Sequence, residues 1–342
     1  MKKRIWKLFL LTTILTLPLV SCAKKPLEEQ FEDAIIYHPK RVSIKTLEKI
    51  LDKGCPIDYL SHGKTPLYAM CYMKIGNENE VMDFLIKKGA DVNFSIELHD
   101  DSENMLLPKR KRDFCITNCN SPEKVELLVS NGASVDADCG NGITPLVYYT
   151  YLAANSYEPS LYRTLLKIIE VLLDNGADAN HRLESNVTPL VIALQYEKRD
   201  LVNLLMRHGA EIHEDFVRMR KKLYEHIEIY EEYLFSELTS VFSSGYVDLA
   251  KKYLENHNVD LFSDIGIGLD YFCCAVISDK PEMVKLILPY YGNINSRRYT
   301  LVKLHDKMPI YGVTLYGIAD AYGCQNSERT LLEHGADGFL HY

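Results

Sequence analysis

The chain has 342 residues with a formal net charge of −8, and 47% of its residues are hydrophobic. This length allows two ordinary domains or one long array of repeats, and the composition is that of a globular protein. The acidic balance argues against a nucleic-acid partner, because general nucleic-acid binders place Lys and Arg on phosphates.

The first 22 residues have the pattern of an export signal rather than of a folded element. Basic residues at positions 2–4 precede an apolar stretch at 9–19, which is too short to span a bilayer as a helix. The sequence LVSC at 19–22 resembles the bacterial lipobox, a motif whose cysteine is acylated after cleavage on its N-terminal side. The resemblance predicts a signal peptide at 1–21 and lipidation of Cys22.

The same resemblance gives an expected location. Ala23 follows the cysteine, whereas in enterobacterial lipoproteins an Asp at this position retains the protein at the inner membrane. Ala23 therefore favours the outer membrane, and several acyl chains would anchor the protein there by burying CH2 groups. We expect a protein of the bacterial cell envelope, facing either the periplasm or the cell surface, with residues 22–29 as a lipidated tether.

Residues 166–190, LKIIEVLLDNGADANHRLESNVTPL, contain the end of one helix and the beginning of the next. Apolar residues recur at helical spacing up to Leu173. Gly176 follows, where the left-handed conformation that ends a helix is cheap only for glycine. Thr188 can cap free N–H groups, and Pro189 suits the first helical position because it has no N–H to leave unpaired.

This pairing of Thr-Pro-Leu with Gly-Ala-Asp resembles the ankyrin repeat. The glycine that ends the second helix recurs along the chain at Gly54, Gly89, Gly132, Gly176, Gly209 and Gly335. Two weaker copies have His257 and Tyr291 in its place. The resemblance implies about eight stacked helix pairs, an all-α solenoid over residues 30–342, with residues 27–37 as a terminal cap.

The openings of the repeats are less regular than their ends. Thr-Pro-Leu occurs at 65–67, 144–146 and 188–190, degraded copies occur at 236–238 and 313–315, and residues 111–113 and 270–272 match by position alone. Unequal spacing of the glycines predicts inserted segments at 95–109, 153–163 and 297–312. The insertion at 215–234 has no Gly or Pro and is rich in helix formers, so we expect an added helix there.

No motif in the sequence predicts catalysis, a cofactor or a metal site. Beyond Cys22 the eight cysteines include no Cys-x-x-Cys pair, and several fall where the repeat places small apolar residues, so core packing is expected. Cys115 and Cys119 lie one helical turn apart, which leaves a redox or metal pair as a minor alternative. His213-Glu214 lacks the second His of a zinc-protease motif, and the Gly-Ile-Gly at 266–268 lacks the third Gly of a dinucleotide fingerprint.

Ankyrin arrays bind proteins, so the resemblance implies a protein partner without catalysis, in addition to membrane attachment through the acyl chains. Two alternatives stay open: an inhibitor or immunity-type protein that blocks an exported or envelope enzyme, and an enzyme with an unrecognised site. The basic run at 109–112 is interpreted as a solvated loop, with contact to an anionic lipid or partner as a second reading.

In the ankyrin family the partner lies against hairpin tips and exposed residues of the inner helices. Counted from each Thr-Pro-Leu, the tip positions are His62, Lys64, Asn141, Ile143, Glu184, Ser185 and Val187. The inner-helix positions are Tyr72, Met73, Tyr151, Leu152, Gln195 and Tyr196. The three tyrosines favour an interface, because tyrosine offers a broad contact area and a hydroxyl group. They could equally cover helix ends between repeats.

Overall fold

The computed structural model describes residues 25–36, 42–98, 108–212, 217–224, 227–235, 237–262, 269–296, 299–302 and 309–338. The predicted signal peptide at 1–21 and Cys22 lie outside these residues. The chain divides into two compact units, Met1–Phe94 and Ser95–Tyr342. Within the described residues, no helix is both long enough and apolar enough to cross a membrane.

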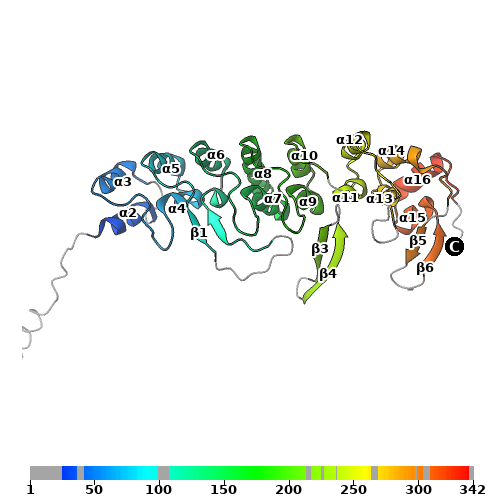
Figure 1. The fold of residues 1–342 in the computed structure, drawn as a ribbon, viewed down its shortest axis with the longest axis horizontal. Helices are drawn as coiled ribbons and strands as arrows, with labels where there is room; N and C mark the ends of the chain where they lie inside the picture. The colour runs from blue at the N-terminus through cyan, green and yellow to red at the C-terminus, as the bar shows by residue number, and fades with distance from the viewer. Residues whose placement is uncertain are drawn as a thin grey trace, which may run out of the picture. The chain divides into compact units, whose positions relative to one another are not determined.

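The first unit contains two helix pairs (Figure 1). Its helices are α2 (Leu27–Ile36), α3 (Ile44–Leu51), α4 (Pro66–Tyr72) and α5 (Glu78–Lys87). Helix α2 packs on α3 and α4 packs on α5. Helix α2 begins at Leu27, inside the segment 22–29 that is predicted to be a tether.

The second unit contains the remaining helix pairs and three two-stranded hairpins (Figure 1). Its elements are β1 (Ser95–Glu97), β2 (Arg112–Phe114), the 3-10 helix η1 (Ile116–Asn118), α6 (Pro122–Ser130), α7 (Pro145–Asn155), α8 (Pro159–Asp174), α9 (Pro189–Gln195), α10 (Arg199–Arg207), β3 (Val217–Tyr224), β4 (Ile227–Phe235), α11 (Glu237–Ser243), α12 (Val247–Asn256), α13 (Tyr271–Ile277), α14 (Pro281–Tyr291), β5 (Tyr299–Val302), β6 (Pro309–Val313), α15 (Leu315–Ala321) and α16 (Gln325–Glu333).

The helices of the second unit form two layers. The inner helices α7, α9, α11, α13 and α15 pack on one another in succession. In the outer layer α6 packs on α8. Further along the chain α12 packs on α14, and α14 packs on α16. The hairpins extend from the side of the inner helices (Figure 1). Stacked helix pairs of this kind confirm the predicted all-α solenoid.

The predicted openings begin helices because their threonines cap them. The hydroxyl of Thr65 accepts a hydrogen bond from the Tyr68 N–H at 3.2 Å, and Thr188 accepts one from Val191 at 3.0 Å. The degraded opening at 313–315 works in the same way, since Thr314 caps α15. The sequence at 111–113 does not begin a helix: its last two residues belong to β2, and the inner helix of this repeat is reduced to the short η1.

The glycines that end the outer helices adopt the predicted left-handed conformation. Their φ angles lie between 84° and 96° at Gly54, Gly89, Gly132, Gly176, Gly209 and Gly335. His257, in a weaker repeat, ends α12 with an extended φ of −133°. Tyr291 does not occupy the glycine position, because α14 continues through it and Gly292 makes the turn at a φ of 79°.

The insertions differ from expectation in two places. The helix predicted at 215–234 is wrong: the segment forms the antiparallel hairpin β3–β4, in which a basic strand faces an acidic one, with Arg220 opposite Glu232 and Lys221 opposite Glu231 in the register. The insertion at 153–163 lengthens α7 and α8 instead of forming a loop. The segments at 95–109 and 297–312 contribute to hairpins β1–β2 and β5–β6.

The core follows the inner helices. The residues five positions after each opening threonine, or its equivalent, are at most 1% exposed, and they are Met70, Tyr149, Ala193, Val241 and Ala275. The eight described cysteines are also buried and not joined in disulfides, which confirms the core-packing interpretation. Leu172 and Leu205 fill the outer layer without exposure.

Candidate partner-binding site

The hairpin tip of the first unit is a tight turn that presents two predicted site residues. Ser61 and Lys64 exchange backbone hydrogen bonds of 3.0 Å in both directions. His62 and Gly63 between them have positive φ angles of 49° and 76°. The turn leaves the His62 side chain exposed and the Lys64 side chain half-buried.

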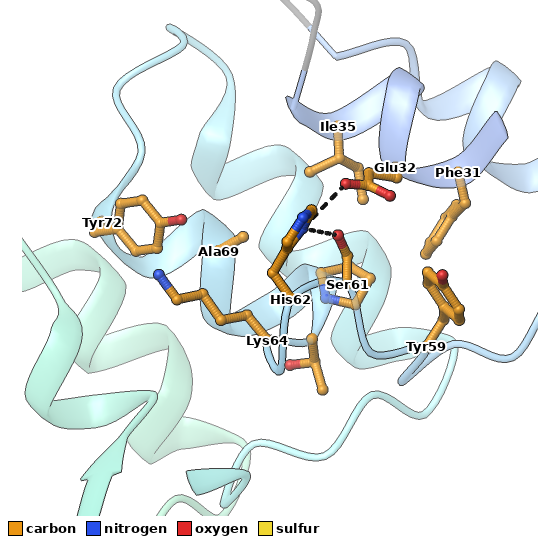
Figure 2. Close-up of a pocket in the computed structure, with 11 residues that line it drawn as sticks. Phe31, Glu32, Ile35, Tyr59, Ser61, His62, Lys64, Ala69 and Tyr72 are labelled. Carbon is orange, nitrogen blue, oxygen red and sulfur yellow. Dashed lines mark hydrogen bonds and ion pairs between the residues drawn. The ribbon is translucent and has the colours of Figure 1, made fainter. Parts of the chain in front are cut away.

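A pocket of about 150 Å³ lies beside this tip (Figure 2). It is lined from α2 by Phe31, Glu32 and Ile35, from the tip by Tyr59, Ser61, His62 and Lys64, and from α4 by Thr65, Pro66, Ala69 and Tyr72. The Lys64 Nζ lies 5.2 Å from the centre of the Tyr72 ring, which favours a cation–π interaction. The structure therefore brings His62, Lys64 and Tyr72 together. Met73 follows them at the C-cap of α4, half-buried, and is not one of the lining residues.

In the second unit the tips are joined to neighbouring loops through backbone groups. The Asn141 side chain, at a φ of 56°, donates to the Lys109 carbonyl at 2.7 Å. The His181 Nε2 lies 2.6 Å from the Gly142 carbonyl. Two other predicted tip residues, Glu184 and Ser185, are exposed. Asn141, Glu184 and Ser185 are thus accessible to a partner.

The prediction that Ile143 and Val187 contact a partner is wrong. Ile143 is 0% and Val187 2% exposed, and both belong to one buried cluster with Val147 and Val191. Each immediately precedes the capping threonine, at the point where the chain turns from the tip into the inner helix. At that point the apolar side chain packs inward, so counting an offset from Thr-Pro-Leu does not identify a surface position.

Four half-buried aromatic residues cover this buried cluster and form what we call the aromatic patch: Phe114, Tyr148, Tyr151 and Tyr196. Tyr151 and Tyr196 are predicted site residues, and their neighbours Leu152 and Gln195 are also half-buried. Phe114 and Tyr148 are not among the site residues predicted from the sequence. Tyr148 lies four residues after Thr144, one helical turn from the tip, and this spacing is the signal that could have identified it.

The basic run at 109–112 is partly incorporated into this region. The Arg110 guanidinium lies 3.6 Å from the centre of the Tyr148 ring, and its Nη1 pairs with Asp113 at 2.9 Å. The Thr117 hydroxyl donates to the same Asp113 carboxylate at 2.6 Å. Arg110 is therefore held over the patch, whereas Lys111 and Arg112 are exposed. The interpretation as a solvated loop holds only for part of the run.

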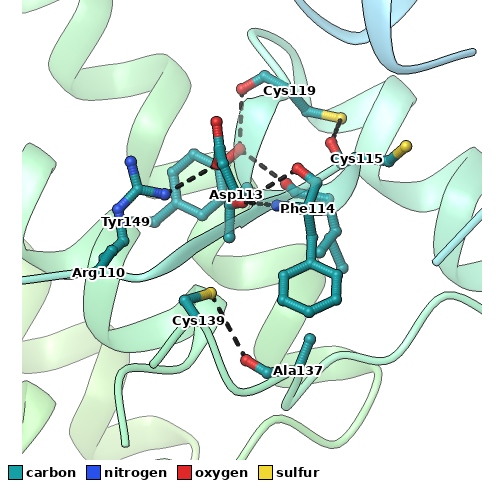
Figure 3. Close-up of polar contacts among 10 residues, drawn as sticks. Arg110, Asp113, Phe114, Cys115, Cys119, Ala137, Cys139 and Tyr149 are labelled. Carbon is teal, nitrogen blue, oxygen red and sulfur yellow. Dashed lines mark hydrogen bonds and ion pairs between the residues drawn. The ribbon is translucent and has the colours of Figure 1, made fainter. Parts of the chain in front are cut away.

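The buried thiols of the second unit, Cys139 beside the patch and Cys274 on α13, are poorly suited to chemistry. Burial raises the pKa of the Cys139 thiol to about 12, and burial raises that of Cys274 to about 12 as well. A thiolate, which is the nucleophilic and metal-binding form, is therefore disfavoured. Cys119 donates to the Cys115 carbonyl at 3.3 Å, as a buried side chain does in a turn (Figure 3).

The other sequence features considered for chemistry give no site. Across the described residues, no group of three or more His, Cys, Asp or Glu side chains is placed to hold a metal ion. His213-Glu214 and the Gly-Ile-Gly at 266–268 lie outside the described ranges.

Comparison with known proteins agrees with this geometry. Residues 62–95 match the family model described as "Ankyrin repeat", and residues 114–215 match the one described as "Ankyrin repeats (3 copies)". The ankyrin repeat protein FPV031 of Fowlpox virus (strain NVSL) is 27% identical over 160 residues, which is 39% of this chain and 45% of the viral protein. The chain thus aligns with less than half the length of this relative. The chain contains ankyrin repeats at 62–95 and 114–215, and its described helices form an all-α repeat solenoid.

Proposed function

We propose that this chain is a lipid-anchored protein–protein interaction module of the bacterial cell envelope. Ankyrin repeats imply a protein partner, and the viral relative is also an ankyrin repeat protein. The observation that carries the proposal for this chain is the aromatic patch. The Arg110 guanidinium lies over its Tyr148 ring, and the carbonyl of the adjacent Lys109 accepts a hydrogen bond from the accessible tip residue Asn141.

The patch has the physical properties of a binding surface. Aromatic side chains and arginine are enriched at the centre of interfaces, because they combine a large contact area with polar groups. Here the rings are already ordered, since each packs against the buried cluster, and Arg110 is fixed by Asp113. An ordered surface loses less conformational entropy on binding than a mobile one.

Membrane attachment is the second part of the proposal and rests on the sequence. The LVSC at 19–22 after an apolar stretch supports acylation of Cys22, and Ala23 supports the outer membrane as the location. Acyl chains would keep the module at a membrane while its repeats bind a protein partner.

The test is partner capture from an envelope extract with two matched variants. The first carries Tyr151→Ala and Tyr196→Ala, and the second carries Lys167→Ala and Arg207→Ala on the exposed faces of α8 and α10. Captured proteins are identified by mass spectrometry, and the binding of the purified partner is then measured. We expect affinity to fall by more than about tenfold only in the tyrosine variant, as truncation of central aromatic residues does.

A melting curve for each variant separates lost binding from lost folding, because the two tyrosines are half-buried. Gln195→Arg provides a further check, since it places a charge beside the patch without removing a ring. Equal partner binding by the wild type and the tyrosine variant would refute the proposal. If capture yields one enzyme whose activity falls when this chain binds it, the inhibitor alternative replaces the general interaction module.

A further inference from the structure

The pocket beside the first tip holds a carboxylate in surroundings that suit a cation. Glu32 lines it from α2 with a side chain that is only 16% exposed, whereas the His62 ring is 84% exposed. A carboxylate that has lost most of its water is unfavourable without a counter-charge. Within the described ranges its ion-pair partner is the His62 Nδ1 at 3.5 Å, and this ring carries a charge only when protonated.

The labelled lining residues lie on two sides of His62 (Figure 2). Phe31 and Tyr59 lie on the same side of the pocket as the carboxylate, and Lys64 lies on the far side of His62 (Figure 2). The Lys64 ammonium group is directed to the Tyr72 ring at 5.2 Å. The Lys64 ammonium group therefore contacts Tyr72 rather than Glu32. The Glu32 carboxylate can pair with a positive group from a ligand.

The remaining lining residues give the pocket a fixed apolar floor. Phe31 is 1% exposed and Ile35 2% exposed, and Ala69 of α4 is buried beside them. A space of about 150 Å³ with such a floor accommodates one side chain rather than a folded ligand. The combination of an apolar floor, aromatic walls and one largely buried carboxylate selects a long side chain with a cationic end.

We infer that this pocket binds an arginine side chain of the protein partner. A guanidinium pairs with a carboxylate through two parallel hydrogen bonds, stacks on aromatic rings and stays charged at all relevant pH values. A lysine ammonium would provide only a point charge. The inference rests on the proposed function, that this chain binds a protein, and names one chemical group that the partner contributes.

The test uses the full chain with isotope-labelled isoleucine methyl groups and follows the Ile35 signal by NMR at about pH 7, where an arginine side chain is charged. The probe is N-acetyl-arginine amide, and its neutral isostere N-acetyl-citrulline amide is the control ligand. We expect saturable shifts of Ile35 with a dissociation constant roughly in the millimolar range, and about tenfold weaker binding of the citrulline compound.

Two variants locate the effect. Glu32→Gln should remove the preference for arginine over citrulline, whereas Glu29→Gln removes the same charge from an exposed position on α2 and should preserve it. Thermal melting of both variants checks that α2 still packs.

Equal shifts from arginine and citrulline would overturn the inference. So would an unchanged preference in Glu32→Gln, or Ile35 shifts caused by N-acetyl-glutamate amide instead. The proposed function is tested separately by the tyrosine variants of the second unit. Failure of the arginine probe with intact partner capture therefore overturns this inference alone, and failure of capture overturns the proposed function.

Discussion

Gly140 supports the loop that carries Arg110, and replacing it with alanine should cost more than the same change at Gly209. Both glycines have positive φ angles, 98° at Gly140 and 84° at Gly209. A Cβ atom at Gly209 would meet nothing within 4 Å, whereas one at Gly140 would lie 2.8 Å from the Lys111 backbone nitrogen and 2.7 Å from its Cβ. These atoms cannot rotate away as the end of a flexible side chain would.

The difference between the two variants follows from this geometry. The left-handed conformation costs alanine about 1–2 kcal/mol at either position. At Gly140 the loop must also shift, and the Cys139 carbonyl then loses hydrogen bonds from Lys111 at 2.7 Å and Arg112 at 2.9 Å. Each such bond contributes about 0.5–1.5 kcal/mol, so Gly140→Ala should exceed Gly209→Ala by about 1–3 kcal/mol.

Urea unfolding followed by far-UV circular dichroism measures this difference. Equal slopes of the unfolding free energy against urea concentration would show that both variants expose the same surface on unfolding. Because the shift would displace Arg110 from Tyr148, Gly140→Ala should also weaken partner capture while Gly209→Ala preserves it. Equal unfolding midpoints for the two variants would refute the reasoning, since the contact with Lys111 would then have no energetic effect.

Three further changes test the core, a buried carboxyl group and the anchor. Leu205→Ala should lower the free energy of unfolding by about 2–5 kcal/mol, because it truncates a fully buried side chain, and urea unfolding measures the loss. Burial raises the pKa of Asp270, so the wild type should lose stability relative to Asp270→Asn as the pH rises from about 4 toward 7, measured as urea midpoints. Cys22→Ala should abolish incorporation of labelled palmitate.

Each of these has its own refuting result. An unchanged midpoint for Leu205→Ala would mean that the outer layer is not packed as described. A pH dependence identical in the wild type and Asp270→Asn would mean that Asp270 titrates alike in the folded and unfolded chains. Palmitate that still enters the Cys22→Ala variant would refute acylation at that residue.

Local signals in the sequence predicted most of the helix boundaries. Thr65 and Thr188 begin helices because each hydroxyl accepts a hydrogen bond from the N–H three residues later, and a proline follows each threonine directly. All of these groups lie close together in the chain. Gly176 ends a helix for an equally local reason, its φ of 88°. Tyr291 is one exception, since the helix continues through it and Gly292 makes the turn, and His257 is another, since it ends α12 with extended backbone.

The errors arose where partners distant in the sequence determine the structure. Residues 215–234 have helix-forming composition, but β3 and β4 pair with each other along the hairpin, and pairing with a neighbouring strand overrides a helix propensity that is only a weak local preference. The inner helix of the third repeat shrinks to η1 because β2 occupies the preceding residues, including Asp113, which Arg110 and Thr117 bind.

The candidate site was predicted in part for the same reason. Tyr151 and Tyr196 follow from counting along a repeat, and the structure places both in the aromatic patch. Ile143 was assigned to the surface by the same count, although its side chain packs inward. Glu32 could not be identified by counting, because it reaches the pocket from the terminal cap, which has no Thr-Pro-Leu to count from.

Hairpin β3–β4 has a consequence for engineering this chain. Its two ends, Val217 and Phe235, are opposite partners in the register, and such partners lie about 4.5–5.5 Å apart between Cα atoms. The residues between them leave and return at nearly one point, so their number can change without altering the spacing of the helices on either side. This hairpin is therefore a site for grafting a foreign peptide or deleting the segment, with α9–α10 and α11–α12 still stacked.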